Sequence, residues 1–438
     1  ATVHFPIWHK EIEDILVLKN NKGTEDNRVR KLDYSIQISK LFYERFIQNT
    51  TISLFSPHDV PGLYDAFGGE KFDDLYIKYE SDESIPRTTI DAQELFLDLI
   101  KERAETGRIY VMNIDHCNSH SSFEVPVTMS NLCQEITLPT RPLTHIDDEN
   151  GEIALCTLSA INWGNIKTPA DFAKPCELAV RGLDALLTYQ NYPVLAAERS
   201  TMKRRPLGVG IINLAYWLAK NDTNYTNPNL ALVDEYAEAW SYYLIKASAD
   251  LAVEQGQCPG TDETKYGDGI TPNQTYKTDV DELVPHVERM DWKGLRKQLA
   301  DTGIRNSTLM ALMPSETSAQ ISNATNGVEP PRAFVSVKQS KDGVLKQVVP
   351  GYPRLKNKYE LLWDQQSPEG YLKIMAVLQK YIDQGISVNT SYNPEHYEDE
   401  KVPMSVLIQD ILTFYKYGGK QLYYNNTYDG QGEIDVHK

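Results

Sequence analysis

Short strand-like runs alternate with longer helical runs along this 438-residue chain, and this alternation constrains the fold more than any other feature. Apolar and β-branched residues predict strands over residues 49–56, 107–114, 152–163 and 420–424. Apolar residues at helical spacing predict helices over 179–187, 234–256 and 404–418, the second with Asp234 as its N-cap. Strands that alternate with helices favour an α/β fold with a substantial parallel sheet.

The charge and the cysteine content exclude several classes of protein. The formal net charge is −17, and the densest basic cluster, residues 202–206, is short and typical of a solvated or helix-capping feature, so we expect no direct nucleic-acid binding. No run approaches the roughly 18 apolar residues of a membrane helix, and the start shows no signal-peptide pattern. Five cysteines without a C-x-x-C pair fit a reducing compartment, which predicts a cytoplasmic protein without membrane contact.

The segment SNLCQEITLP, residues 130–139, places an amide, a thiol and a carboxylate at alternate positions. An extended backbone would put Asn131, Cys133 and Glu135 on one face, each about 6.6 Å from the next. Such a row could grip a small substrate that carries adjacent hydroxyls. A half-exposed strand with a buried free cysteine fits the same spacing, and so does a cysteine hydrolase, although the segment has no histidine to activate the thiol.

The stretch MPSETS joins hydroxyl groups to the free backbone N–H groups of a helix start. The residues concerned are Pro314, Ser315, Glu316, Thr317 and Ser318. This combination suits an anion site and an ordinary helix cap about equally. Tyr423 and Tyr424 also allow a structural and a functional interpretation. Neighbours in a regular strand point to opposite faces, which favours ordinary strand packing. If the two rings stacked instead, they could relay electrons and protons.

Two other patterns favour structural interpretations. HCNSH has metal-like spacing between His116 and His120, but its Asn and Ser residues favour a polar turn. GVGIINLAYWLAK has Gly208 and Gly210 but lacks the third glycine of a dinucleotide loop, so we expect close helix packing there.

Several longer runs together resemble one known family. They are LVLKNNKGTEDNRVRKLDY, LFSPHDVPGLYDAF, SNLCQEITLPT, ENGEIALCTLSA, RSTMKRRPLGVG, RNSTLMALMPSETSAQISNATNG and LYYNNT, in this order along the chain. With them the chain resembles the large (α) subunit of class I aerobic ribonucleotide reductase, from the middle of that subunit nearly to its end. The resemblance implies part of a ten-stranded α/β barrel with a central finger loop near 130–139, a small inserted α+β lobe and C-terminal helices.

The resemblance, together with a weaker and more polar pattern between about residues 266 and 299, implies a division of the chain. A barrel portion would occupy residues 1–264. A small inserted lobe would occupy 265–325, with a phosphate loop at 314–318 at its end. The remaining barrel and helical portion would occupy 326–438, and its polar end, residues 420–438, would form a C-terminal tail.

The same resemblance implies roles for the NLCQE segment. Cys133 would carry the thiyl radical that takes the 3′ hydrogen of the ribose, and Glu135 would accept the 3′-hydroxyl proton. Asn131 would position the ribose hydroxyls, and Leu132 and Gln134 would also line the substrate. A carboxylate that takes this proton eases the loss of water at C2′, and burial in a barrel protects the radical from solvent.

Other site residues take their roles from the resemblance as well. Cys156 would be one half of the redox pair that supplies electrons and ends as a disulfide. Tyr423 and Tyr424 would end the radical relay from the small subunit, and the loop at 314–318 would bind the substrate phosphates. Cys117, Cys176 and Cys258 match no catalytic position.

The implied activity is the reduction of ribonucleoside diphosphates to 2′-deoxyribonucleoside diphosphates. We expect no metal or cofactor in this chain, because a di-iron tyrosyl radical would be supplied by the small (β) subunit, and nucleotide effectors would bind mainly in an N-terminal portion of the large subunit. We expect that N-terminal portion and thioredoxin or glutaredoxin as further partners, and no activity from this chain alone. The competing interpretation is an inactive nucleotide-binding remnant or an assembly partner of a reductase.

Overall fold

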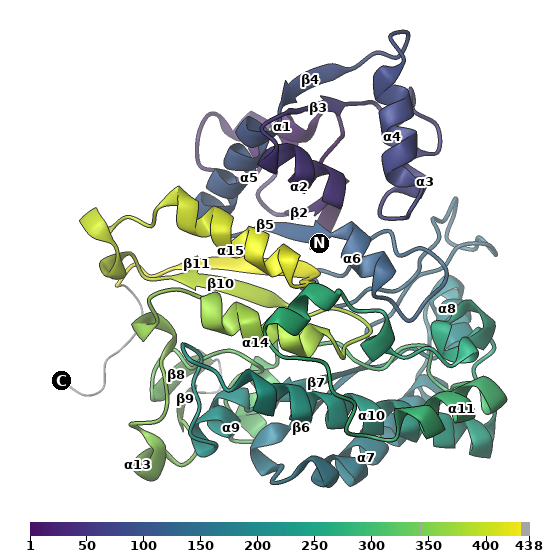
Figure 1. The fold of residues 1–438 in the computed structure, drawn as a ribbon, viewed down its shortest axis with the longest axis vertical. Coiled ribbons are helices and arrows are strands. Elements are labelled where there is room, and N and C mark those ends of the chain that lie inside the picture. The colour runs from purple at the N-terminus through teal and green to yellow at the C-terminus, as the bar shows by residue number, and fades with distance from the viewer. Residues whose placement is uncertain (341–342, 431–438) are drawn as a thin grey trace.

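The computed structural model describes residues 1–340 and 343–430 of the chain (Figure 1). Its strands are β1 (Thr2–Pro6), β2 (Asp33–Ile38), β3 (Thr51–Leu54), β4 (Thr88–Asp91), β5 (Ile109–Asn113), β6 (Leu158–Asn162), β7 (Gly208–Ile212), β8 (Val335–Ser340), β9 (Gly343–Val348), β10 (Val388–Tyr392) and β11 (Gln421–Thr427). Its α-helices are α1 (Ile12–Leu16), α2 (Lys40–Ile47), α3 (Leu63–Ala66), α4 (Phe72–Ser81), α5 (Ala92–Thr106), α6 (Ile114–Ser119), α7 (Ala173–Tyr189), α8 (Leu195–Arg204), α9 (Leu214–Lys220), α10 (Leu230–Gln255), α11 (Trp292–Thr302), α12 (Glu316–Ile321), α13 (Tyr352–Leu355), α14 (Glu369–Gln379) and α15 (Met404–Lys416).

Two groups of parallel strands meet in the centre of the molecule. The main sheet has the order β1-β2-β5-β11-β10, in which β1, β2 and β5 run parallel, and β10 and β11 run parallel. The pair β5–β11 is antiparallel and joins the two groups. Parallel bridges from Ile386 to Leu312 and from Met310 to Val209 continue the second group to β7 and its parallel partner β6. The chain is therefore α/β with mostly parallel pairing, as the sequence predicts.

A closed ten-stranded sheet is not formed by the described residues. The strand pairings recorded for residues 1–340 and 343–430 leave β1 and β6 at the two ends of the arrangement, without a pairing between them. In Figure 1, helices α1–α5 and the hairpin β3–β4 lie above the main sheet, whereas α7, α10 and α11 lie on the side of β6 and β7. No helix in the described part of the chain is both long and apolar enough to cross a membrane.

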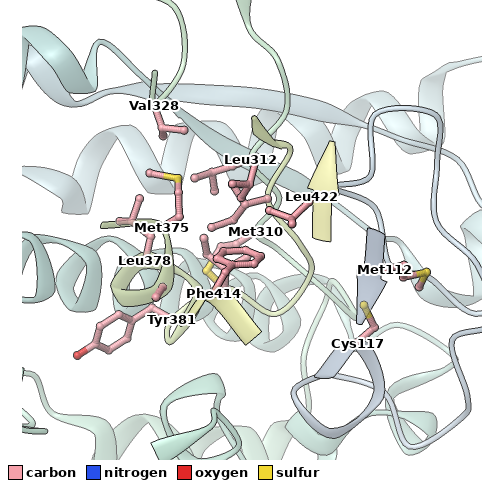
Figure 2. Packing of buried hydrophobic residues seen from close by; sticks show 14 of the residues in the cluster. Met112, Cys117, Met310, Leu312, Val328, Met375, Leu378, Tyr381, Phe414 and Leu422 are labelled. Atoms are coloured by element: carbon pink, nitrogen blue, oxygen red, sulfur yellow. The ribbon is translucent and has the colours of Figure 1, made fainter. Parts of the chain in front are cut away.

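A buried apolar cluster fixes the outer face of β11 against two helices. Figure 2 shows Leu422 of β11 with Met310 and Leu312 of the neighbouring extended segment, close to Phe414 of α15 and Met375 of α14. All five side chains are buried, so each stabilises the fold by about 1.5–3 kcal/mol relative to an exposed position. Because successive side chains in a strand point to opposite faces, the residues on either side of Leu422 point away from this cluster.

Most of the predicted elements are confirmed. The strands at 49–56 and 107–114 correspond to β3 and β5, and the strand at 420–424 corresponds to β11. The three predicted helices correspond to α7, α10 and α15, and α10 is capped at its C-terminus by Gly256, whose φ of 85° suits glycine.

Asp234, however, does not cap α10. The helix begins about one turn earlier, with the side chain of Asn229 as its N-cap. Asp234 is instead fully buried and forms ion pairs with Lys380 Nζ at 3.3 Å and Arg289 Nη1 at 3.0 Å. A buried carboxylate needs such partners because desolvation penalises an isolated charge. The residue type that suggests a surface cap thus belongs to an interior ion-pair network.

Three local predictions are also corrected. Only the second half of 152–163 is a strand, because 152–157 runs irregularly and pairs with other segments. HCNSH lies mostly in the short helix α6 and not in a turn, and the ring Nδ1 of His116 is 2.9 Å from the carbonyl oxygen of Gly419. Gly208 begins strand β7, where a Cβ atom would come within 2.5 Å of Leu158 Cδ2. The close packing there is between strands and not between helices.

The predicted domain division stays a prediction. Residues 265–325 contain α11, α12 and the 3-10 helices Lys265–Asp268, Pro272–Gln274 and Thr278–Glu282. No named strand falls in this range within the described residues, and the antiparallel hairpin β8–β9 follows it. Of the predicted C-terminal tail, residues 421–427 form β11, and residues 431–438 lie outside the described residues.

Candidate active site

The loop 130–139 turns sharply and does not run extended. Gln134 has a positive φ of 70°, and its backbone N–H donates to the carbonyl oxygen of Asn131 at 3.2 Å. The side-chain Oδ1 of Asn131 accepts a hydrogen bond at 3.1 Å from a backbone N–H further along the loop. The extended row predicted from the sequence is therefore wrong, but the turn still brings Glu135 into hydrogen-bonding contact with Asn131 and into electrostatic contact with Cys133.

One side of the loop rests on the face of the main sheet that carries Ser35, Gln37, Met112 and Gln421, which we call the inner face. Gln37 and Gln421 both pair with Met112 across neighbouring strands, so their side chains point the same way. Ser35 Oγ donates to Gln134 Oε1 at 2.8 Å, and Gln37 Nε2 donates to a backbone carbonyl just before the loop at 2.7 Å. Gln134, predicted to line the substrate, is thus buried against the sheet.

The other side of the loop is held by the segment that precedes β10. The backbone N–H of Gly385 donates to the carbonyl oxygen of Glu135 at 2.9 Å. Ser387 Oγ lies 2.6 Å from the carbonyl oxygen of Cys133 and 3.0 Å from Glu135 Oε2. A Cβ atom on Gly385 would come within 3.2 Å of the Glu135 carbonyl oxygen and 2.1 Å of Gln421 Oε1, so the close approach requires glycine here. Ser387 and Gly385 carry no sequence signal, since they become neighbours of Cys133 only in the fold.

Tyr423 and Tyr424 stack on each other and reach the thiol of Cys133. Their ring centroids are 3.8 Å apart with an interplanar angle of 28°, and the Tyr423 hydroxyl donates to the Tyr424 hydroxyl at 2.7 Å. The Tyr423 hydroxyl also hydrogen-bonds with the Cys133 thiol. Consecutive residues of a regular strand would point to opposite faces, but β11 carries an irregularity in its register with β10 at this point.

Burial is the largest influence on the pKa values of the thiol and the carboxyl group in this loop. Burial raises the pKa of the Cys133 thiol, and the hydrogen-bonding interaction between this thiol and the Tyr423 hydroxyl opposes part of that effect. Burial also raises the pKa of the Glu135 carboxyl, against the hydrogen bonds from Asn131 and Ser387. A thiol that keeps its hydrogen and a carboxylate with increased basicity suit hydrogen-atom and proton transfer, respectively.

Cys156 lies near the same site. Desolvation raises the pKa of its thiol to about 12, and the nearby charges of Glu135 and Cys133 add to the effect. Its side chain is nevertheless exposed, so a reactant from solution can reach it. The remaining cysteines are buried: Cys117, Cys176 and Cys258.

Two residues that carry no sequence signal complete the tyrosine cluster. The ring of Tyr110, in β5, lies 4.8 Å from the ring of Tyr423 and 6.0 Å from that of Tyr424, measured between centroids. Arg108 donates from Nη1 to the Tyr424 hydroxyl at 3.1 Å, and its Cζ lies 4.5 Å from the centre of that ring. Pairing between β5 and β11 brings them together from distant parts of the chain.

The predicted phosphate loop follows the extended segment beside Gly385. Leu312 pairs with Ile386, and α12 begins at Glu316 after Ser315, whose side chain donates to a neighbouring carbonyl and does not cap the helix. Pro314, Glu316, Thr317, Ser318 and, in the other loop, Leu132 are exposed. The predicted phosphate loop therefore follows closely after Leu312, which pairs with the segment 385–387. That segment in turn contacts Cys133 and Glu135.

The family model described as "Ribonucleotide reductase, barrel domain" matches residues 1–358 and 351–425, so the chain belongs to the barrel-domain family of ribonucleotide reductases. The curated relatives are more particular. The chain is 57% identical over 99% of its length to the "Ribonucleoside-diphosphate reductase subunit alpha" of Haemophilus influenzae. It is 55% identical over 98% of its length to the "Ribonucleoside-diphosphate reductase 1 subunit alpha" of Escherichia coli, and 44% identical over 99% to the subunit alpha of Enterobacteria phage T4. The chain spans 57–58% of the length of these relatives. The resemblance inferred from the motifs is confirmed.

Proposed function

We propose that this chain is the catalytic portion of the large subunit of a ribonucleoside-diphosphate reductase. It would reduce ribonucleoside diphosphates to 2′-deoxyribonucleoside diphosphates by thiyl-radical chemistry. The observation that carries the proposal is the unbroken contact from the Tyr424 hydroxyl through the Tyr423 hydroxyl to the Cys133 thiol, with Glu135 beside that thiol. The names of the relatives support the same activity.

The tyrosine pair would deliver the oxidising equivalent to the thiol. Hydrogen-bonded, stacked phenols can pass an electron and a proton together, so a phenoxyl radical on Tyr424 would move to Tyr423. Tyr423 would then take the hydrogen atom of the Cys133 S–H, which leaves a thiyl radical and an intact phenol. The raised pKa of the Cys133 thiol favours this step, because it keeps the hydrogen on sulfur at neutral pH.

The thiyl radical and the carboxylate would then act on the ribose. Cys133 sulfur would take the 3′ hydrogen atom, and Glu135 would take the proton of the 3′ hydroxyl, which eases departure of the 2′ hydroxyl as water. Asn131 would hold the hydroxyls, as its amide is anchored within the turn. After reduction at C2′, Cys133 would return its hydrogen atom to C3′ and become a thiyl radical again.

Cys156 would supply half of the reducing dithiol. Two thiols would give two electrons and two protons, and their sulfurs would end joined in a disulfide. We propose that the second cysteine comes from an N-terminal portion of the large subunit, and that thioredoxin or glutaredoxin restores the dithiol. The exposed hydroxyls and helix start at 314–318 would bind the diphosphate of the substrate.

The remaining components of the assembled reductase would come from other chains or segments. Strands contributed beside β1 and β6 would complete a ten-stranded barrel, with 130–139 as its finger loop. The same N-terminal portion would hold most of the effector-binding residues. A small subunit with a di-iron tyrosyl radical would supply the oxidising equivalent, and no group of three or more His, Cys, Asp or Glu residues in the described part of this chain is arranged to hold a metal ion.

The test is reduction of cytidine diphosphate by this chain mixed with the N-terminal portion, the small subunit and a chemical dithiol. We expect activity in the complete mixture and none from this chain alone. Cys133→Ser should abolish the activity because oxygen cannot replace the sulfur radical. A correctly folded mixture without activity would overturn the proposal and favour the inactive remnant.

A further inference from the structure

The stacking of Tyr423 on Tyr424 depends on a bulge in β11. Strands β10 and β11 run parallel, and their register shifts so that both tyrosines lie opposite Asn389 alone. The regular pairs on either side are Val388 with Leu422 and Thr390 with Asn425. Bulges are rare between parallel strands, and the additional residue turns one side chain toward the face of its neighbour. Without the bulge, one of the two rings would point to the outer face of the sheet.

Three polar side chains hold the bulge. Asn389 Oδ1 accepts a hydrogen bond from the backbone N–H of Tyr424 at 2.9 Å, and its Nδ2 donates to Glu329 Oε1 at 2.5 Å. Arg103 of α5, only 2% exposed, donates to the carbonyl oxygens of Tyr423 at 2.7 Å and Tyr424 at 3.2 Å. Side chains therefore satisfy three backbone polar groups of the bulge: the N–H of Tyr424 and the carbonyl oxygens of Tyr423 and Tyr424.

Glu329 decides which way the amide of Asn389 points. The Glu329 oxygen that faces Asn389 accepts a hydrogen bond from the NH₂ group of the amide, so this end of the amide points toward Glu329. The carbonyl end of the amide is then directed at the Tyr424 N–H, which only donates. The hydrogen bond between Glu329 and Asn389 thus leaves the amide oxygen of Asn389 facing the Tyr424 N–H at the bulge.

We propose that Asn389, oriented by Glu329, is a positioning residue that stacks the two tyrosines for radical transfer to Cys133, with Arg103 holding the opposite side of the same bulge. This role rests on the proposed function, because it serves the same relay. Asn389 itself touches neither the tyrosine hydroxyls nor the substrate-binding loop in the contacts described above, and it acts through the backbone of β11.

The test uses Asn389→Ala in the large subunit reconstituted from this chain and its N-terminal portion. The matched control is Asn426→Ala, which removes the hydrogen bond from Asn426 Nδ2 to Ser391 Oγ, 3.2 Å long, between the same two strands. We expect Asn389→Ala to lower kcat about tenfold or more without changing KM, since a misplacement of about 1 Å can cost about 100-fold in rate. The control should keep nearly full turnover.

Radical trapping separates positioning from a general loss of folding. The easily oxidised analogue 3-aminotyrosine would be placed at position 424 or 423, and its radical would be measured by electron paramagnetic resonance with the small subunit present. In Asn389→Ala, we expect an unchanged radical yield at 424 and a reduced yield at 423. Loss of both signals, or of neither, would overturn the proposal.

A double variant provides the rescue. Asn389→Asp alone would face one carboxylate with another, whereas Asn389→Asp with Glu329→Gln restores an acceptor for the Tyr424 N–H and a donor between the two side chains. We expect the double variant to recover turnover and trapping at 423 relative to Asn389→Asp. A crystal structure of Asn389→Ala with the rings still stacked would refute the role of Asn389. Full activity of Tyr423→Phe, measured in parallel, would instead refute the relay itself.

Discussion

Ser387→Ala offers a quantitative test of how the site sets the basicity of Glu135. The hydroxyl of Ser387 lies 3.0 Å from Glu135 Oε2 and lowers the pKa of this carboxyl, against the larger, opposite effect of burial. Hydrogen bonds to charged groups contribute about 1.5–3 kcal/mol. Because the same hydroxyl lies 2.6 Å from the carbonyl oxygen of Cys133, its single proton is shared, and the lower figure applies.

A loss of about 1.5 kcal/mol corresponds to a rise of about one pH unit in the pKa of Glu135. The proposed base works as a carboxylate, so kcat/KM should fall as the pH drops through this pKa. In Ser387→Ala the acidic limb of the pH profile should therefore move about one unit towards higher pH, with less change at high pH. The assay is cytidine diphosphate reduction by the assembled enzyme across the pH range.

Ser387→Thr is the matched control, because it keeps the hydroxyl and adds one methyl group. Its acidic limb should stay within about 0.3 pH units of the unmodified enzyme, since the hydrogen bond to the carboxylate remains. An acidic limb that does not move in Ser387→Ala, or that moves equally in both variants, would refute the reasoning.

Two further predictions concern the Cys133 thiol and the interior of the fold. In a Cys156→Ser background, Tyr423→Phe should slow the alkylation of Cys133 at a fixed pH near 8. Loss of the interaction with the Tyr423 hydroxyl raises the pKa of the thiol and so reduces the fraction present as thiolate. An unchanged or faster rate would contradict the contact between Tyr423 and Cys133. Asp234→Ala should lower the free energy of unfolding in urea by about 3 kcal/mol or more, because the buried Lys380 loses the nearer of its two carboxylate partners and Arg289 loses one of its own. Asp222→Ala, at an exposed ion pair, should cost less than about 1 kcal/mol, and equal effects of the two variants would contradict the assignment of a buried network.

The sequence predicts the elements whose signals are local. The apolar stripe of α7, the stop at Gly256 and the apolar run of β5 each depend on residues within one element, and the structure confirms them. The identity of the family follows from motif order, and it selects Cys133 and Glu135 before any contact between them is known. These inferences succeed because their information lies in short stretches of chain.

The geometry of the site could not be predicted, because it depends on contacts between distant segments. Gln134 takes a positive φ without being glycine, and a hydrogen bond from Ser35, 99 residues away, holds it there. The tyrosines stack because Asn389, 35 residues earlier, accepts the N–H that the bulge leaves outside a regular ladder. The strict alternation of side chains expected for an extended backbone therefore fails both in the loop 130–139 and at the tyrosine pair of β11.

The antiparallel pair β5–β11 has a consequence for where a reaction can take place. In sheets whose strands all run one way, the carboxyl ends gather at one edge, and substrates bind in the loops there. Here β1, β2 and β5 end on one side of the molecule, whereas β6, β7, β10 and β11 end on the other. Neither rim of the described arrangement collects the carboxyl ends of all its strands, so the candidate site instead combines the loop 130–139, which rests on the inner face of the main sheet, with side chains from the middle of β11.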